Sequence, residues 1–518
     1  MRQRRNHVIV SPADDDSIDK FTSKNPEIKN SSPSLCKIFI ICLITRIINS
    51  LLVQTYFNPD EHWQGSEVAH RIAFGYGHLT WEWKMGIRSY LHPVLFAALY
   101  KVLAFFRLDL TWCMIRAPRL LQSVFSSVGD LYLYKFSRAL FGDNVAYWAL
   151  FAHLETVLTV VSLYHWPCLR ASSGGVRFGS RKRALALAAL ACAIRPTSAV
   201  TWVYIGFIEL FMAHDKLKFV LLEVVPIGGL VLGLTFLLDR QFYGSWVIVP
   251  LNFLKFNFFS SGGDYYGTHA WHWYMTHGFT VMLFTFIPFS VAGIIMSKEW
   301  KLSGLIIWVL GIYSLLGHKE FRFMTPNIRF VLPVLPISLM FSGYSLDNLR
   351  QCEVSKRKVK QGSSSRTKCF SKLRMSVFFL LVTNLPMALY MSMVHQVILP
   401  KHIIRQTKLQ SDYRGAEDVM NYLSDEAREY RVKSIVFLTP CHATPYYSTL
   451  HQNIPMRFLD CTPSEEKGIL DESDRFIKDP FGFVTTLKRN WTIPSHIVLF
   501  DAQEKLLKEF LVSHHFYE

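Results

Sequence analysis

The chain has 518 residues, of which 50% are hydrophobic and only 18% are charged, and its mean hydropathy is +0.20. This composition is too apolar for an ordinary soluble protein, and the apolar residues form separate blocks, as in a membrane protein with many spans. The net charge of +17 does not indicate a nucleic-acid partner, because Lys and Arg are concentrated in short segments between these blocks.

Residues 1–34 are rich in Ser, Asp and Lys and predict a disordered cytosolic leader. The leader lacks a small-residue cleavage site, so the first apolar block is predicted to be a retained anchor. Candidate membrane helices fall near 35–53, 91–106, 119–140, 144–166, 184–213, 218–238, 280–297, 302–316, 328–347 and 375–397. Arg195-Pro196 interrupts the 184–213 block, which is therefore expected to cross twice, giving about eleven crossings.

The basic N-terminus and the basic 351–374 loop indicate the cytoplasmic side. The 54–90 loop, the 239–279 loop, the 317–327 turn and everything after about residue 398 then lie on the opposite side. A glycosylation sequon at Asn490-Trp491-Thr492 agrees with that side, and so does a possible Cys441–Cys461 disulfide, although both cysteines could be buried thiols.

The last 120 residues differ from the rest of the chain. One stretch has helical spacing: DYRGAEDVMNYLSDEAREY. Two others have the pattern of short buried strands: VKSIVFL and SHIVLF. We therefore predict a mainly α polytopic membrane protein over 35–397, followed by a small lumenal α/β domain over 398–518. The role of that domain is left open between a scaffold and a surface for the acceptor.

Residues 54–90 form a polar, Trp-rich stretch between two apolar blocks, and are the predicted catalytic loop. Asp60 and Glu61 are adjacent carboxylates, suited to proton abstraction, with Glu67 and His70 nearby as candidate substrate ligands. Trp81 and Trp83 offer flat apolar faces that stack on sugar rings. The competing interpretation is that the carboxylates are solvated and the aromatic residues belong to the interfacial belt.

Further polar groups are predicted on the same side. Arg195 lies at the helix break, where a charge needs water or a partner. The 239–279 loop holds an aromatic run with His269, His272 and His277, whose spacing only weakly suggests a metal site. At the end of the 302–316 block stand His318, Lys319, Glu320, Phe321 and Arg322, which form either a functional cluster or a self-paired helix cap.

Together these parts suit transfer of a sugar from a lipid phosphate to an acceptor hydroxyl. A carboxylate takes the hydroxyl proton, cations stabilise the leaving phosphate and aromatic rings orient the sugars. A monophosphate leaving group does not require a metal, so neither a metal nor another cofactor is expected.

The segment FNPDEHWQGSEVAHRIAFGYGHLTWEW and the cluster HKEFRF resemble those of the dolichyl-phosphate-mannose-dependent α-mannosyltransferases, which belong to the C-type glycosyltransferase superfamily. The resemblance covers most of the chain from about residue 36. It is strongest to the branch that adds the third mannose to the glycosylphosphatidylinositol (GPI) precursor in the endoplasmic reticulum. It implies an inverting α1,2 transfer with a lipid-linked donor and a glycolipid acceptor, and leaves protein partners unknown.

By position, the resemblance implies that Asp60 is the base and Glu61 its acidic neighbour, and that His318, Lys319, Glu320, Arg322 and Phe323 form the family signature. A donor-phosphate role for Lys319, Arg322 or Arg195 is our inference from charge. The chain departs from the family pattern twice: a stretch before Leu154-Glu155-Thr156 is shorter, and residues 324–330 are additional.

Three alternatives remain at this stage. A related mannosyltransferase could act on the dolichol-linked oligosaccharide or at another position of the anchor lipid. A transporter would show paired inverted repeats, which the sequence lacks. A non-catalytic membrane subunit is the third.

Overall fold

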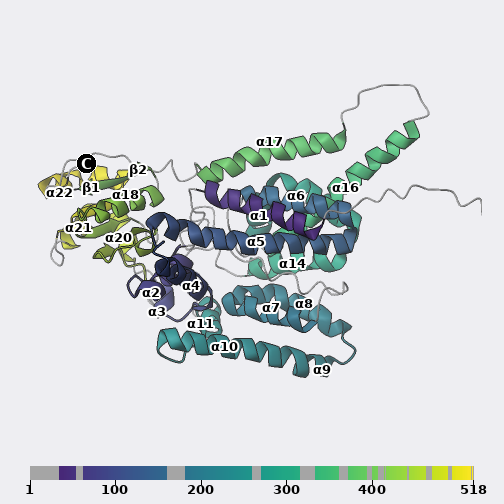
Figure 1. The fold of residues 1–518 in the computed structure, drawn as a ribbon, viewed down its shortest axis with the longest axis horizontal. Helices are drawn as coiled ribbons and strands as arrows, with labels where there is room; N and C mark the ends of the chain where they lie inside the picture. The colour runs from purple at the N-terminus through teal and green to yellow at the C-terminus, as the bar shows by residue number, and fades with distance from the viewer. Residues whose placement is uncertain are drawn as a thin grey trace, which may run out of the picture. The chain divides into compact units, whose positions relative to one another are not determined.

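The computed structural model describes residues 34–53, 62–159, 181–259, 270–315, 333–360, 371–393, 400–405, 413–414, 416–439, 443–462, 470–487, 493–514 and 516. Most of the described chain is helical, as predicted (Figure 1). Residues Leu35–Glu518 form one unit, which includes both the apolar helices and the strands.

The apolar part begins with α1 (Leu35–Leu52), the π-helical turn His62–Ser66, α2 (Glu67–Phe74), α3 (Trp81–Lys84), α4 (Leu91–Phe105), α5 (Thr111–Phe141) and α6 (Asp143–Thr159). It continues with α7 (Arg181–Ile194), a 3₁₀ turn (Pro196–Ser198), α8 (Ala199–Met212), α9 (Lys216–Phe219), a π turn (Val220–Val224) and α10 (Val225–Tyr243). There follow α11 (Val249–Leu254), two π turns (Lys255–Phe259 and Tyr274–Gly278), α12 (Phe279–Leu283), a 3₁₀ turn (Phe284–Phe286), α13 (Ile287–Ser297), α14 (Trp300–Leu315), α16 (Leu335–Lys360) and α17 (Lys372–Met393).

Four of the described helical segments are long and apolar enough to cross a membrane: Leu35–Leu52, Lys216–Tyr243, Tyr274–Ser297 and Lys372–Tyr390. Three shorter apolar helices cover Leu91–Phe105, Pro196–Met212 and Trp300–Leu315. All seven coincide with predicted spans, so the chain is a helical membrane protein. The predicted number of about eleven crossings stays a prediction.

The helix break predicted at Arg195-Pro196 is present. Arg195 has an extended backbone (φ −139°, ψ 107°) between α7 and the 3₁₀ turn, as expected for a residue before proline. The two helices on either side are each 14 residues long.

Close helix packing in the bundle depends on glycines of α13 and α16. A Cβ atom on Gly293 of α13 would lie 1.9 Å from the Phe341 carbonyl oxygen of α16. A Cβ atom on Gly343 of α16 would lie 2.4 Å from the Ala149 nitrogen of α6. These backbones approach closely because the side chains are absent, as is usual where membrane helices pack.

We expect Gly293→Ala to destabilise the folded protein by about 1–3 kcal/mol, because the added methyl meets backbone rather than a side chain that could rotate away. Gly233→Ala in α10 is the matched control, since a Cβ atom there has no neighbour within 4 Å. Thermal unfolding of the detergent-solubilised variants measures both. Equal melting temperatures for the two would contradict the packing described.

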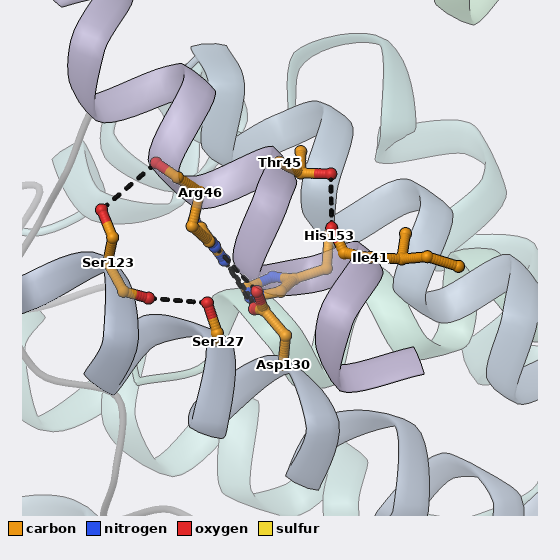
Figure 2. A network of polar contacts seen from close by, with 7 residues as sticks. All are labelled: Ile41, Thr45, Arg46, Ser123, Ser127, Asp130 and His153. Atoms are coloured by element: carbon orange, nitrogen blue, oxygen red, sulfur yellow. Dashed lines mark hydrogen bonds and ion pairs between the residues drawn. The ribbon is translucent and has the colours of Figure 1, made fainter. Parts of the chain in front are cut away.

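A buried ion pair joins α1, α5 and α6, three helices that lie side by side (Figures 1 and 2). Arg46 of α1 donates from Nε and Nη2 to the two carboxylate oxygens of Asp130 on α5, at 2.7 and 2.5 Å. The His153 Nε2 of α6 lies 3.2 Å from the same carboxylate. All three side chains are less than 10% exposed. A charge in an apolar bundle needs such a partner, so this contact fixes the three helices together.

The C-terminal part contains β1 (Pro400–Arg405), β2 (Tyr413–Arg414), α18 (Ala416–Arg428), β3 (Ile435–Leu438), α19 (Tyr447–Leu450), β4 (Met456–Phe458), α20 (Glu472–Lys478), α21 (Pro480–Leu487), β5 (His496–Phe500) and α22 (Asp501–Ser513). The strands form one sheet in the order β2-β1-β5-β3-β4. β3 is parallel to β4 and β5, and β1 is antiparallel to β2 and β5. The predicted helix and both predicted strands of this segment are present.

The two faces of the sheet bury alternate residues, as a two-residue strand period requires. Ile435 and Phe437 pack with residues of α18 on one face. Val436 and Leu438 pack with residues of α20, α21 and α22 on the other. Trp63 of the first loop belongs to the first of these two cores, although it is more than 300 residues away in sequence.

Candidate active site

The predicted catalytic pair, Asp60 and Glu61, lies outside the described residues, but both flanks of the pair are described. Val53 ends the preceding segment and His62 begins the next one. Two arginines of α5 lie at the first flank: Arg116 donates to the carbonyls of Ser50, Leu51 and Val53 at 3.3, 2.9 and 3.2 Å, and Arg119 donates to that of Val53 at 2.9 Å. They satisfy carbonyls that the end of α1 leaves without helical partners.

Arg119 also acts on the second flank. Burial, followed by the charge of Arg119, lowers the pKa of His62 to about 3. His62 is therefore neutral at neutral pH and adds no positive charge next to Glu61. Arg119 therefore places a positive charge near both Val53 and His62, the described residues on either side of the segment that carries Asp60 and Glu61.

Arg195, a predicted substrate ligand, lies where three parts of the chain meet. Its charge acts on His92 at the start of α4 and on Tyr313 near the end of α14. The His92 ring in turn hydrogen-bonds to the backbone of Gln64 in the first loop. The Tyr313 hydroxyl donates to the Thr197 carbonyl at 2.8 Å, beside the helix break.

The helix that leads to the predicted cationic cluster runs beside the helix break. Trp308 of α14 donates from Nε1 to the Val200 carbonyl of α8 at 3.0 Å, and Tyr204 of α8 donates to the Lys301 carbonyl of α14 at 2.9 Å. α14 ends at Leu315, so residue 318 follows three positions later. His318, Lys319, Glu320, Arg322 and Phe323 themselves lie outside the described residues, as do the additional residues 324–330.

The two tryptophans predicted as sugar platforms differ in their surroundings. Trp81 is half-buried, with its ring 5.3 Å from that of Phe256. Trp83 is only 2% exposed and packs against Tyr90, with its Nε1 donating to the Trp63 carbonyl at 3.3 Å. A covered ring has no face for a ligand, so burial does not support a platform role for Trp83, and Trp81 is the better candidate.

Glu67 and His70, predicted to bind substrate, both contact the C-terminal segment. Glu67 is fully buried and accepts hydrogen bonds from Tyr446, Tyr447 and Ser448 at the start of α19. Burial raises the pKa of its carboxyl, and these hydrogen bonds oppose the rise. His70 Nε2 lies 3.1 Å from His451 Nδ1, and burial lowers the pKa of His70 to about 3. Their predicted contact with substrate stays a prediction.

The weak metal interpretation gains no support in the part of the chain that the structure describes. No group of three or more His, Cys, Asp or Glu side chains there could hold a metal ion. His272 and His277 are linked through the Thr276 hydroxyl, at 3.4 and 2.7 Å, and His269 lies outside the described residues.

Comparison with known proteins supports the resemblance over nearly the whole chain. Residues 37–451 match the family model described as the Alg9-like mannosyltransferase family. The chain belongs to the Alg9-like mannosyltransferase family. Mannosyltransferase APTG1 of Arabidopsis thaliana is 60% identical over 506 residues, covering 93% of this chain and 88% of that protein. GPI alpha-1,2-mannosyltransferase 3 of Mus musculus is 37% identical (92% and 83% covered), and that of Homo sapiens is 36% identical (92% and 82%). The chain is therefore a glycosyltransferase, as predicted.

Sequence reasoning missed several residues of this Alg9-like mannosyltransferase. Arg116 and Arg119 lie three positions apart, which places them on one helix face, a spacing that was visible in the sequence. The predicted span began at residue 119, so Arg116 fell outside it and the two arginines were not placed on one helix. His62 and His92 carry no local signal, since their importance comes from the neighbours that the fold supplies.

Proposed function

We propose that this protein transfers mannose in α1,2 linkage from dolichyl phosphate mannose to the GPI precursor, as its third mannose, on the lumenal side of the endoplasmic-reticulum membrane. The observation that carries the proposal is the similarity over 92% of the chain to relatives named GPI alpha-1,2-mannosyltransferase 3. The alternative acceptor is the dolichol-linked oligosaccharide.

In the proposed reaction, the carboxylate of Asp60 takes the proton of the acceptor hydroxyl while that oxygen bonds to the anomeric carbon of mannose. The bond from that carbon to the phosphate oxygen breaks on the opposite face, so the configuration inverts. Glu61 orients the base or the acceptor. Dolichyl phosphate leaves with both electrons of the broken bond, and no metal or other cofactor is invoked.

Arg195, with Lys319 and Arg322, stabilises the leaving phosphate in this proposal. The position of Arg195 supports this role, because the first loop, the helix break and the end of α14 meet around it. His92 connects it to the first loop, and Tyr313 connects it to α14. Trp81 orients a sugar ring. The donor's lipid belongs in the bilayer, and the break is flanked by the apolar helices α8 and α14.

The lumenal side of the site is supported by Cys461, which is disulfide-bonded. Disulfides persist in oxidising compartments, and the endoplasmic-reticulum lumen is one. Cys441, its predicted partner, and Asn490 lie outside the described residues. We propose about eleven crossings, with residues 1–34 in the cytosol and the 54–90 loop and residues 398–518 in the lumen.

We expect Arg195→Gln to lower kcat/KM for dolichyl phosphate mannose by on the order of 10- to 100-fold, which corresponds to one lost charge-assisted hydrogen bond to the leaving phosphate. The KM for the acceptor should change little. Arg181→Gln at the start of α7, the helix that precedes Arg195, is the control, because Arg181 is exposed and pairs with Glu223. A larger effect on the acceptor would move Arg195 to the acceptor side of the site.

The proposed function itself is tested in cells that lack third-mannose transfer. Expression of this chain should restore GPI-anchored proteins to the cell surface and convert the accumulated two-mannose lipid into the three-mannose lipid. Accumulation of the two-mannose lipid in cells that express the protein at a normal level would contradict the proposal.

A further inference from the structure

The short helix α19 of the C-terminal segment is bound by the first loop through one carboxylate. Glu67 Oε1 accepts from the amides of Tyr446 and Ser448, at 2.8 and 3.1 Å, and from the Ser448 hydroxyl at 2.6 Å. Glu67 Oε2 accepts from the Tyr447 amide at 3.1 Å. One side chain of α2 thus supplies the acceptor for the amides that begin α19, a role usually filled by a local cap residue.

A second contact is apolar and lies closer to the catalytic pair. Trp63 is 2% exposed inside the core formed by α18 and one face of the sheet. Its ring meets that of Tyr446 edge-on at 4.5 Å, and its carbonyl accepts from Trp83. Asp60 stands three positions before Trp63 in the sequence, and three residues of fully extended chain span at most about 11 Å.

A third contact is a chain of polar groups. His70 Nδ1 lies 3.3 Å from the Tyr76 carbonyl. Because a carbonyl oxygen can only accept a hydrogen bond, Nδ1 of His70 carries the proton. Nε2 of His70 then accepts from His451 Nδ1. His451 Nε2 lies 3.4 Å from the carboxylate of Asp109, at the end of the α4–α5 connection. His451 thus joins the first loop to that connection.

The start of α5 is held by the same C-terminal segment. The Thr111 hydroxyl lies 2.9 Å from that of Ser424 and accepts from Arg428 at 2.7 Å. α5 also carries Arg116 and Arg119, which bind the end of α1. The C-terminal segment thus contacts the part of the first loop that follows the catalytic pair. It also contacts α5, whose arginines bind the end of α1, which precedes the pair.

We propose that the C-terminal α/β segment positions the catalytic loop, and that Glu67 is a positioning residue that acts through α19 rather than a ligand of the substrate. The inference rests on the proposed function, because it assigns the segment's contacts to the same mannose transfer. It also gives a role to part of the 398–518 domain, whose role the sequence left open between a scaffold and a surface for the acceptor.

The test compares Glu67→Gln, Ser448→Ala and the double variant in membranes, using dolichyl phosphate mannose and the two-mannose acceptor. We expect Glu67→Gln to lower kcat by on the order of 10²-fold, since misplacement of about 1 Å has that effect, and to leave both KM values within about twofold. Ser448→Ala should lower kcat less, and the double variant should resemble Glu67→Gln, because both changes remove the same contact.

Glu426→Gln is the matched control. Glu426 is a buried carboxylate of α18 that binds Arg431 at 2.7 Å, and both residues belong to the C-terminal segment, so its loss perturbs that segment itself. It should leave kcat unchanged at equal protein level.

Two results would overturn the inference. If Glu67→Gln raised a substrate KM at unchanged kcat, Glu67 would be a substrate ligand. If both Glu67→Gln and Ser448→Ala kept the wild-type kcat, the contact would have no role in positioning. Should Glu67→Gln fail to accumulate, Ser448→Ala decides alone, because it removes one hydroxyl. An inactive wild-type protein would instead refute the proposed function, so the two failures are distinguishable.

Discussion

Replacing Asp60 by Asn should reduce mannose transfer by about 10²- to 10⁴-fold, the range that a general base contributes. The amide cannot take the acceptor proton, yet it has the same shape and can still accept a hydrogen bond. The KM for the lipid donor should therefore change little. Purified variant, dolichyl phosphate mannose and acceptor lipid provide the measurement, with kcat and KM determined separately.

Glu82→Gln is the control for Asp60→Asn, because Glu82 is a partly exposed carboxylate of the same loop that pairs with Arg88 at 2.8 Å. Its loss should leave kcat near the wild-type value. Wild-type kcat in Asp60→Asn would remove Asp60 from the role of base. If Asp60→Asn and Glu82→Gln both lost activity, the loop would tolerate no change of charge. The role of Asp60 as the base would then have no support.

Asp130→Ala should have the largest effect on stability. It leaves the Arg46 guanidinium buried among α1, α5 and α6 without its carboxylate partner, which costs about 3–5 kcal/mol. Because a protein is stable by only about 5–15 kcal/mol, the variant should accumulate poorly and unfold at a much lower temperature. Fluorescence-detected size exclusion and thermal unfolding of the solubilised protein measure both effects.

Two comparisons make the Asp130 prediction specific. Asp215→Ala breaks the exposed pair with Lys218, at 2.9 Å, and should cost less than about 1 kcal/mol. The double change Arg46→Met with Asp130→Leu should recover much of the lost stability, because removal of both charges leaves neither unpaired. Wild-type stability of Asp130→Ala would contradict the description of this contact.

Local signals predicted much of the secondary structure. The length and apolarity of residues 35–53 predicted α1, and the proline after Arg195 predicted the break between α7 and α8. The short apolar runs within VKSIVFL and SHIVLF predicted β3 (Ile435–Leu438) and β5 (His496–Phe500). Each of these features depends on residues that are neighbours in the chain.

Features that depend on distant neighbours were not predictable. Trp83 was predicted to be a sugar platform, but the fold buries it. Trp63 is likewise buried, in a core built by residues after 416. Asp130 lies inside an apolar block and gave no sign of its pairing with Arg46, 84 positions earlier. Glu67 was predicted to bind substrate, and nothing near it in the sequence indicated its partners Tyr446 and Ser448, which are nearly 400 residues away.

The most direct test of the central claim is transfer by the purified protein in defined lipid. Dolichyl phosphate mannose labelled in the mannose would be supplied with a two-mannose GPI lipid, a three-mannose GPI lipid or a dolichol-linked oligosaccharide. We expect label only in the two-mannose GPI lipid, lengthened by one mannose that an α1,2-specific mannosidase removes. Label in the oligosaccharide instead, or in none of the three from a folded protein, would contradict the proposed function.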